Sequence, residues 1–559
     1  MPRVLATADR VGYGLSGSEY IRSTASKLSE TVSVRDFGAI GDGIANDLLA
    51  FRAAVDVAAT VCVPEGTYIF EGTERATGDL LLPPGTRLIG QGRNSSRIFR
   101  RHAGSGQAVV RVSADCAIED LTIGNDYQGN EAGWRVVVLE DGASNVLIRG
   151  NTIFGPRSYG ISVLGKTLAD VVIEANYFPE SRYGVIFNDS NVQRVRITGN
   201  SILNATADCI LFNLGSASDV VIANNVLSCQ TSDQTNSGFG VDLAGVSGGV
   251  VITGNTFRNM RYQALHVEDS SSNVIFANNC CEGASDDGKS LQTEAAFLIL
   301  NSSGILIANN SFTRFARAGL IGVEVRRPDR PPPSGIVISG NLFKDCGRLL
   351  LTGLSGSASH VREDVSAKIS GNTFRGSWER IVDNLSFSGV EFSGNTLSAS
   401  VGNSDSAVCV LPACGGVVLR QNSYRGFAGR EVGVERGSRL FQSDLYGILE
   451  VTSIRELSDL QRSPIVLFSI GKWAQGVLHV ILQFGSDVRF GARGAFKLSW
   501  DGVRLEDLLV SSESSDRIGE ISLMADDQNL KVFTKNSNLG LESELTGYIS
   551  FEFIGHIFY

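Results

Sequence analysis

A short apolar phrase that ends in asparagine recurs down this chain. It reads VLIRGN at Asn151, VVIEAN at Asn176 and VRITGN at Asn200. Variants of the phrase end at Asn225, Asn255, Asn279, Asn310, Asn341, Asn372, Asn395 and Asn422. Successive phrases are 23 to 31 residues apart. Self-similarity at such a period is the signature of a solenoid protein.

The segments between the asparagines decide which solenoid this is. They contain second apolar strands such as YGISV (159–163) and FGVDL (239–243) and carry no helical stripe. Two or three short strands separated by turns make one coil of a parallel β-helix, in which neighbouring coils pair about 4.8 Å apart. We expect each Asn to lie at a tight inward turn, where its amide bonds the adjacent coils. Asn and Gly also tolerate the left-handed backbone of such a turn.

Charge and composition limit the partners. The 559-residue chain has a net charge of −10, which argues against nucleic acid. No run of about 18 apolar residues occurs, so no membrane insertion is expected, and the first residues lack the apolar core of a secretory signal. Without a P-loop, a GxSxG, an HExxH or a zinc spacing, we expect no cofactor and no metal.

The coil stack needs a cap at its open end. Residues 46–59 predict an N-terminal capping helix that begins at Asn46 or Asp47. Its buried face would carry Leu48, Phe51, Val55 and Ala58. Residues 1–33 are expected to be a short neck or attachment segment. There a capping box from Ser16 to Glu19 would open a helix with Ile21, Ala25 and Leu28 on one face; this is either a surface helix or one that associates with symmetry mates.

The entry region resembles a known family. SVRDFGAIGDGIANDLLAFRAAVDVA (33–58) followed by VCVPEGTYIF (61–70) resembles the start of the pectate-lyase-like right-handed parallel β-helix superfamily. SKLSETVSVRDFGAIGDG (26–43) resembles bacteriophage tailspikes in particular. The likeness is close over residues 27–70 and rests on the repeat pattern alone over 71–430.

The pattern changes near the C-terminus. The parallel β-helix is expected over residues 34–435, whereas alternating runs such as FKLSW and GYISFEFIGHIFY predict an antiparallel β-sandwich over 441–559. In tailspikes such a domain serves trimerisation or glycan binding, and the resemblance implies the same here. A homotrimer would also cover apolar residues expected to point outward, namely Ile186, Leu211 and Ile299.

Candidate site residues come from aligning one strand of each coil. The strands that start at residues 160, 184, 209, 240, 264, 297 and 322 have apolar inward positions throughout, with Leu298, Leu300, Val323 and Val325 among them. The outward positions of the later strands are polar: Asp242, His266, Glu268, Glu324 and Arg326. Water alone could explain this polarity, because outward residues of a solvated β-helix are usually polar.

The pair Asp242 and Glu268 is predicted to be catalytic. One coil and two residues separate them, roughly 8 Å between backbones, and the acid and base of inverting glycosidases lie about 6.5–9.5 Å apart. His266, Glu324 and Arg326 are predicted to bind substrate, although His266 could instead bond Asp242 and Arg326 could pair with Glu324. Reserve carboxylates stand at the strand ends: Asp189, Asp208 and Asp269. Tyr159, Tyr183 and Phe239 are expected either to stack on sugars or to pack inside.

Three functions remain open from the sequence. The resemblance implies a phage tailspike that binds a bacterial surface polysaccharide (O-antigen, capsule or exopolysaccharide) and cleaves it, and the paired carboxylates favour hydrolysis. A non-cleaving receptor-binding spike and a polysaccharide lyase or epimerase are the alternatives. The resemblance further implies a virion protein that is assembled in the host cytoplasm, joined to a phage tail or baseplate protein through its N-terminus, and active at the bacterial surface. In a homotrimer, the site could also lie between subunits.

Overall fold

The computed structural model describes the coil region with gaps and, beyond it, a set of long strands. The described residues are 9, 11–72, 78–101, 108–126, 134–164, 167–229, 238–284, 295–322, 330–352, 366–376, 382–384, 389–403, 408–410, 418–427, 432–434, 440–456, 465–469, 473–484, 491–500, 505–514, 520–526, 529–535 and 540–558. They form two compact units. The first runs to Val267 and includes Ser271–Ile275, and the second contains the rest. No helix in the described residues is long and apolar enough to cross a membrane.

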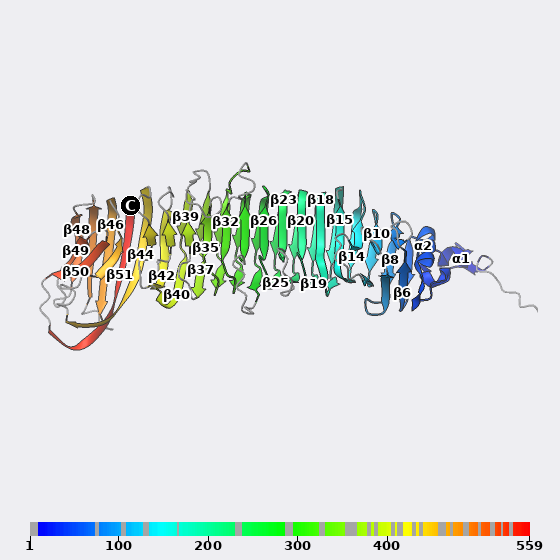
Figure 1. The fold of residues 1–559 in the computed structure, drawn as a ribbon, viewed down its shortest axis with the longest axis horizontal. Coiled ribbons are helices and arrows are strands. Elements are labelled where there is room, and N and C mark those ends of the chain that lie inside the picture. The colour runs from blue at the N-terminus through cyan, green and yellow to red at the C-terminus, as the bar shows by residue number, and fades with distance from the viewer. Residues whose placement is uncertain are drawn as a thin grey trace, which may run out of the picture. The chain divides into compact units, whose positions relative to one another are not determined.

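The first unit is a parallel β-helix, seen from the side in Figure 1. Its strands pair from coil to coil into three faces, called A, B and C. Face A is formed by the strands that end at the asparagine turn: β8 (Arg87–Gly90), β11 (Ala117–Glu119), β14 (Ser144–Arg149), β16 (Thr167–Glu174), the end of β18 (Ser181–Thr198), β21 (Val220–Ala223) and β24 (Val250–Thr253). Face B follows the turn and is formed by β9 (Ser96–Arg101), β12 (Thr122–Asn125), the start of β15 (Thr152–Leu164), β17 (Tyr177–Phe178), β19 (Ser201–Ala205), β22 (Val226–Cys229) and β25 (Thr256–Met260).

Face C completes each coil. It contains β7 (Leu80–Leu82), β10 (Val110–Val112), β13 (Arg135–Leu139), the end of β15, the start of β18, β20 (Ile210–Ser218), β23 (Val241–Ser247) and β26 (Leu265–Glu268) as far as Val267. Every printed pair along the three faces is parallel, as the repeat predicts. The prediction of a parallel β-helix is therefore confirmed.

The asparagines form the predicted ladder inside each unit. In the first unit, Asn176 donates from its backbone N–H (2.9 Å) and its amide (3.1 Å) to Oδ1 of Asn200, which does the same to Asn225. In the second unit the same contacts run from Asn279 to Asn422. Each ladder Asn is at most 2% exposed. The ladder thus pairs polar groups that would otherwise be buried without partners.

The left-handed residue of this turn is the one before the ladder Asn. Its φ is 70° at Gly150, 65° at Gly199, 57° at Asn224 and 54° at Ala175. Glycine adopts this conformation without strain and asparagine tolerates it, which explains why the phrase usually reads GN or NN. The aromatic or aliphatic residue two positions after the Asn points inward; in the second unit the rings of Phe312, Phe343 and Phe374 stack at 5.0 and 4.7 Å.

The entry of the first unit contains the capping helix. α2 spans Leu48–Val57, and the predicted face of Leu48, Phe51, Val55 and Ala58 is buried, although Ala58 is the C-cap. Asp47 is the N-cap by position, but its carboxylate accepts from the N–H groups of Ile40 and Gly41, while Asn46 Oδ1 accepts from Leu48 N.

The helix predicted to begin at Ser16 is wrong. The strands β1 (Gly12–Tyr13) and β2 (Arg22–Ser23) form an antiparallel hairpin across that segment, with a turn in which Ser18 N donates to Leu15 O. The short helix α1 (Thr24–Leu28) begins only after this hairpin, where the Ser23 side chain accepts from Ser26 N. Ile21 therefore lies outside the helix.

The second unit continues the parallel pairing and then changes direction. The coil strands run from β28 (Cys280–Gly283) and β29 (Phe297–Leu300) to β42 (Val418–Phe427), with parallel register throughout. β44 (Leu440–Glu456) pairs in parallel with β42 and antiparallel with β51 (Gly540–Phe558). The printed pairs beyond it are antiparallel and join β46 (Trp473–Phe484), β47 (Gly491–Trp500) and β48 (Leu505–Ser514), and separately β45 (Ile465–Ser469), β50 (Asn529–Lys535) and β49 (Glu520–Asp526). Their packing as a sandwich over 441–559 stays a prediction.

One predicted register is wrong in the second unit. Phe297 and Ile299 are buried while Leu298 and Leu300 are half-buried, so 297 and 299 are the inward positions. Ile299 is 0% exposed and pairs with Ile321 of β32 (Gly319–Gly322), not with a strand that starts at residue 322. Val323 and Val325 lie outside the described residues.

Candidate functional site

The outer side of face C carries a column of residues in continuous register. Arg111, Val138, Ser162, Ile186, Leu211 and Asp242 pair in this order from coil to coil. All are buried within the single chain, and Ile186 and Leu211 are only 5% and 7% exposed. The expectation that these two apolar residues need a symmetry mate to cover them is therefore wrong. The coil itself already shields them from water.

Asp242 and His266 lie at the later end of this column. Backbone bonds from Gly240 N to Gln263 O (2.9 Å) and from Val241 N to Ala264 O (3.0 Å) hold their strands side by side. Each of the two side chains is 8% exposed. The His266 ring stacks on Phe239, with 4.4 Å between ring centroids, and its Nδ1 lies 3.1 Å from Gln263 Oε1. The ring is thus fixed in orientation beside Asp242.

A second column lies three positions before the first one in each coil, and it contains aromatic residues and one aspartate. Tyr159 pairs with Tyr183, and the next coils place Asp208 and then Phe239 at the same position through bonds from Gly184 N to Asp208 O and from Cys209 N to Phe239 O. The rings of Tyr159 and Tyr183 meet edge to face at 5.0 Å. The three aromatic residues are half-buried, so their outer edges remain open to a ligand.

Local packing explains the YG and FG pairs in the sequence. A Cβ at Gly160 would lie 2.9 Å from the Phe178 ring, one at Gly184 would lie 2.5 Å from Ile202, and one at Gly240 would lie 2.4 Å from Phe257. These distances are too short for a side chain. The glycine lets the chain turn tightly over the inward side chain of face B, and this turn leaves the preceding residue on the outer surface.

The carboxyl group of Asp208 in this cluster has a strongly shifted pKa. Burial raises its pKa to about 6, although the N–H groups of Phe239 (3.1 Å) and Gly238 (3.3 Å) and the charges of His266 and Arg182 oppose the shift. Burial also raises the pKa of Tyr183 to about 12, and the carboxylates of Asp208 and Asp242 add to that rise. Tyr183, Asp208, Asp242 and His266 therefore lie within electrostatic reach of one another. A carboxyl with a pKa near 6 beside a second carboxyl group is an arrangement that can serve as an acid–base pair.

Two arginines stand beside the aromatic rings. The Arg182 guanidinium lies 5.7 Å from the centroid of the Tyr183 ring, and Arg261 lies 5.5 Å from that of Tyr262. Tyr262 in turn contacts Phe239 edge to face at 5.8 Å. Cations over aromatic faces hold the rings in place and leave a positive rim near the carboxylates.

The other residues predicted for the site have different outcomes. Glu268 belongs to the second unit and is half-buried, and its pairing with Asp242 stays a prediction. Glu324 and Arg326 lie outside the described residues, so their roles also stay predictions. Of the reserve carboxylates, Asp269 is bound to Arg330 (2.6 Å), Asp189 is exposed, and Asp208 is central to the cluster. Within the described residues, no group of three or more His, Cys, Asp or Glu side chains is arranged to hold a metal.

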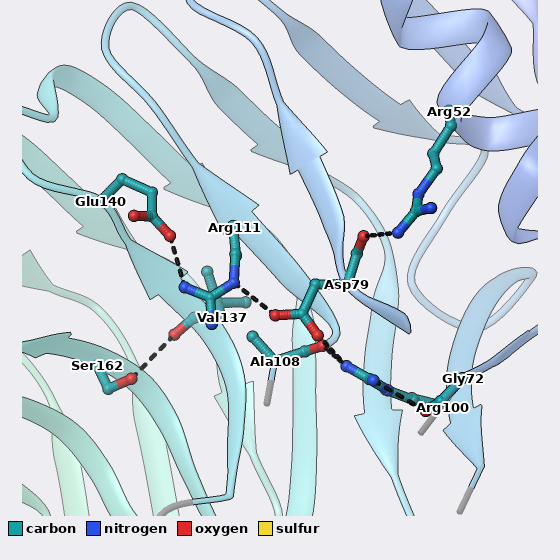
Figure 2. Close-up of polar contacts among 9 residues, drawn as sticks. All are labelled: Arg52, Gly72, Asp79, Arg100, Ala108, Arg111, Val137, Glu140 and Ser162. Atoms are coloured by element: carbon teal, nitrogen blue, oxygen red, sulfur yellow. Dashed lines mark hydrogen bonds and ion pairs between the residues drawn. The ribbon is translucent and has the colours of Figure 1, made fainter. Parts of the chain in front are cut away.

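A separate buried cluster lies near the start of face C. Figure 2 shows Asp79 between Arg100 and Arg111, with Arg111 reaching on to Glu140. Arg111 Nε lies 2.5 Å from Asp79 Oδ2, and its Nη1 lies 2.6 Å from Glu140 Oε1. Two positive and two negative groups balance, and Arg52 of α2 donates to the Asp79 carbonyl at 2.7 Å. With its charges paired in this way, the cluster has a structural role: it joins the capping helix to the first coils.

Comparison with known proteins agrees with this architecture. Residues 109–281 match the family model described as the right-handed β-helix region, and residues 31–120 match the model described as rhamnogalacturonase A/epimerase, pectate lyase-like. The candidate cluster on face C lies within the first of these regions. These parts of the chain are thus similar to the pectate-lyase-like right-handed β-helix proteins.

Individual relatives match over shorter spans. Mannuronan C5-epimerase AlgE2 of Azotobacter vinelandii is 27% identical over 209 residues, which is 32% of this chain and 21% of that protein. The preneck appendage protein of Bacillus phage PZA is 32% identical over 96 residues, 17% of this chain and 10% of that protein. The chain spans about a fifth of the length of the first curated relatives. Among solved structures, a tailspike protein of E. coli bacteriophage HK620 aligns over 98% of both chains with 11% identity and a TM-score of 0.48.

Proposed function

We propose that this protein binds a bacterial surface polysaccharide along face C of its first unit and cleaves it by glycoside hydrolysis. The observation that carries the proposal is Asp208, a buried carboxyl whose pKa is about 6 and which lies in the same electrostatic cluster as Asp242. Half-buried aromatic rings beside these carboxyls offer the flat apolar surfaces on which sugar rings stack. A coil face built from repeated strands suits an extended, repetitive polymer.

The proposed reaction uses the two carboxyls in different protonation states. Protonated Asp208 donates its proton to the glycosidic oxygen as the bond to the anomeric carbon breaks. Ionised Asp242 accepts a proton from a water molecule, whose oxygen bonds to that carbon. Asp208 ends as a carboxylate and regains a proton from solvent, while Asp242 releases to solvent the proton that it took from water. Glu268, the partner predicted for Asp242 from the sequence, is the alternative acid.

The biological setting belongs to the same proposal. A phage preneck appendage protein among the relatives supports a virion-associated protein, and the tailspike resemblance of residues 26–43 points the same way. We infer a homotrimeric spike that attaches through its N-terminal segment to a phage tail or baseplate protein and acts at the bacterial surface after assembly in the host cytoplasm. The polysaccharide would be the receptor that selects the host.

A second candidate reaction is proton abstraction from a uronate, as in a lyase or epimerase. The mannuronan C5-epimerases among the relatives favour it. The protonated hydroxyl of Tyr183 and the ring of His266 would then be the groups that exchange a proton with the sugar carbon. This chemistry predicts unsaturated products or exchange of hydrogen with solvent, whereas hydrolysis predicts neither.

The deciding experiment incubates the purified chain with surface polysaccharides of candidate hosts. New reducing ends, ultraviolet absorbance of unsaturated sugars and deuterium incorporation from D₂O are followed together. Variants Asp208→Asn, Asp242→Asn and Glu268→Gln are compared with Asp189→Asn, an exposed aspartate that serves as the matched control.

We expect reducing ends without absorbance or exchange, with rates reduced at least 100-fold in Asp208→Asn and Asp242→Asn and unchanged in Asp189→Asn. If Glu268→Gln loses hydrolytic activity and Asp208→Asn keeps it, Glu268 and not Asp208 is the general acid. Absorbance or deuterium incorporation would establish the uronate chemistry. Binding without any of the three signals would leave a receptor-binding spike and refute catalysis.

A further inference from the structure

Face B of the first unit contains a hollow that the candidate site does not use. Its volume is about 350 Å³, in the range of small-ligand sites. It is lined by Arg93, Asn94, Arg97, Phe99, Thr122, Thr152 and Tyr177. These residues come from successive coils, because Arg97 pairs with Thr122, Thr122 with Thr152, and Thr152 with Tyr177.

The order of side-chain sizes along this column creates the hollow. Two short threonines stand between the long side chains of Arg97 and Tyr177, which are three coils or roughly 14 Å apart. Behind them, Gly124 leaves room for the Phe99 ring, because a Cβ at Gly124 would lie 3.2 Å from Phe99 Cε1 and 2.7 Å from the carbonyl oxygen of Phe154. The hollow therefore has an aromatic wall at each end and hydroxyl groups on its floor.

The residues that line the hollow include two arginines and no carboxylate. Arg97 donates from Nε to the Asn94 carbonyl at 3.2 Å, and the Arg93 guanidinium lies 6.0 Å from the centroid of the Tyr177 ring. Among the described residues, no carboxylate pairs with either arginine. Several other arginines of this unit are paired with acids, among them Arg87 and Arg149 with Glu119, and Arg194 with Asp170. The hollow thus brings together two guanidinium groups that no described carboxylate pairs, in a chain whose net charge is −10.

We propose that this hollow is a subsite for a carboxylate-bearing sugar of an acidic polysaccharide. The Tyr177 ring, about one-third exposed, supplies a face for the sugar ring. The free Nη groups of Arg97 and the guanidinium of Arg93 supply charged donors for the carboxylate, and Thr152 supplies a hydroxyl for sugar oxygens. The subsite adds a second polysaccharide contact on another face of the coil. It does not depend on cleavage at face C.

The choice of an acidic sugar over other anions follows from the composition of the lining. An inorganic anion would use the two arginines alone and leave the aromatic wall without a role. A nucleic acid would need a longer basic surface than two arginines, because its affinity comes from many phosphate contacts. A neutral sugar would leave both guanidinium groups unpaired.

The test is titration calorimetry with the full chain and tetragalacturonate, beside a neutral maltotetraose of equal length. Variants Arg93→Gln, Arg97→Gln and Tyr177→Ala are compared with Arg258→Gln, an exposed arginine on face B of a later coil. Thermal melting verifies that each variant is folded. The same titration in Asp208→Asn separates this subsite from the proposed catalytic cluster.

We expect tetragalacturonate to bind and maltotetraose not to bind. Each of the three hollow variants should weaken binding at least tenfold, while Arg258→Gln and Asp208→Asn change it less than twofold. Affinity unchanged in Arg93→Gln and Arg97→Gln would overturn the proposal. So would equal affinity for maltotetraose, or equally tight binding of inorganic phosphate or of a single-stranded oligonucleotide to the same arginines.

Discussion

The asparagine amide that recurs once per coil hydrogen-bonds buried polar groups, which apolar side chains of the core cannot do. Asn200 accepts two hydrogen bonds from Asn176 through its Oδ1 and donates from its Nδ2 to Ile173 O (2.9 Å) and Asn225 Oδ1 (3.0 Å). No other side chain offers an acceptor and two donors at this length. Truncation therefore leaves several buried backbone and amide groups without partners.

We predict that Asn200→Ala lowers the free energy of unfolding by about 3 kcal/mol, because each unpaired buried group costs about 1–3 kcal/mol. Urea unfolding of the full chain measures the change. Asn188→Ala is the matched control, since Asn188 bonds Asn213 (2.7 Å) at a half-buried position, and its loss should cost about 1 kcal/mol or less. Equal effects of the two substitutions would show that the ladder is not a special source of stability.

At the residue before the ladder asparagine, a substitution can increase stability instead of lowering it. Ala175 has a φ of 54°, a conformation that costs a residue with a Cβ about 1–2 kcal/mol relative to glycine. We predict that Ala175→Gly stabilises the first unit by about 1 kcal/mol, and that Gly199→Ala, one coil later at φ 65°, destabilises it by a similar amount. Melting temperatures measured side by side provide the check. Shifts of the same sign in both variants would contradict it.

Asp208 couples stability to pH. Its pKa of about 6 in the folded chain lies above the ordinary aspartate value of about 3.9, so the folded state holds the proton more tightly. This contribution to stability is complete below about pH 4 and is lost as the pH rises through 6. We predict that the melting temperature of Asp208→Asn, relative to the unsubstituted chain, rises between pH 4 and pH 7. A constant difference between Asp208→Asn and the unsubstituted chain across this pH range would refute the assigned shift.

Between α2 and the first coils, packing and charge act together. Arg52 of α2 donates to the carbonyl of Asp79, whose carboxylate is shared by Arg100 and Arg111 (Figure 2). Burial lowers the pKa of Arg100, and the ion pair with Asp79 offsets the cost of keeping it charged. Removing one member of such a buried cluster leaves an uncompensated charge.

We predict that Asp79→Asn destabilises the first unit by about 3–5 kcal/mol. Asp170→Asn, which breaks the exposed pair with Arg194 (2.7 Å), should cost about 1 kcal/mol or less. Hydrogen exchange of the residues of α2 distinguishes a local effect from a global one, because the capping helix should lose protection first. Unchanged protection of α2 in Asp79→Asn would mean that the cluster does not hold the cap.

An element can be predicted from the sequence when a local pattern specifies it, and is harder to predict when pairing with another segment decides it. The ladder, the parallel faces and α2 follow from local phrases and were predicted. The strand FLIL at 297–300 is apolar at every position, so it contains no alternation to fix its register, and the prediction slipped by one residue. At the N-terminus, the Ser16 to Glu19 pattern resembles a cap, but the pairing of Gly12–Tyr13 with Arg22–Ser23 takes its place.

The candidate site was only partly predictable for a similar reason. Asp242 and His266 are visible as polar residues that follow the apolar Ile186 and Leu211 in their column. The importance of Asp208 depends on burial and on the N–H groups of Gly238 and Phe239, which come from the next coil. One signal was available: Asp208 occupies the position held by Tyr159, Tyr183 and Phe239 in neighbouring coils. A lone carboxyl in an aromatic column marks a functional position.

The whole chain is predicted to be a trimer, although not for the reason first expected. Ile186 and Leu211 are already buried, but exposed apolar side chains gather near the N-terminus, among them Ile44 (75% exposed) and Leu49 (73% exposed). We predict a sedimentation mass of three chains, and partial or full dissociation on the double substitution Ile44→Glu and Leu49→Glu. Leu81→Glu, at a half-exposed position on face C, is the control. A single-chain mass without substitution would refute the trimer.

The ladder has one more consequence, which concerns how such a protein changes over evolutionary time. Each rung contacts only the rung before and the rung after it, while the spacing between rungs varies from 23 to 31 residues. Loops can therefore lengthen or shorten without disturbing the scaffold. A duplication or deletion of one whole period restores every contact of the ladder, so recombination between related genes at the repeated phrase can yield folded chains with new surfaces.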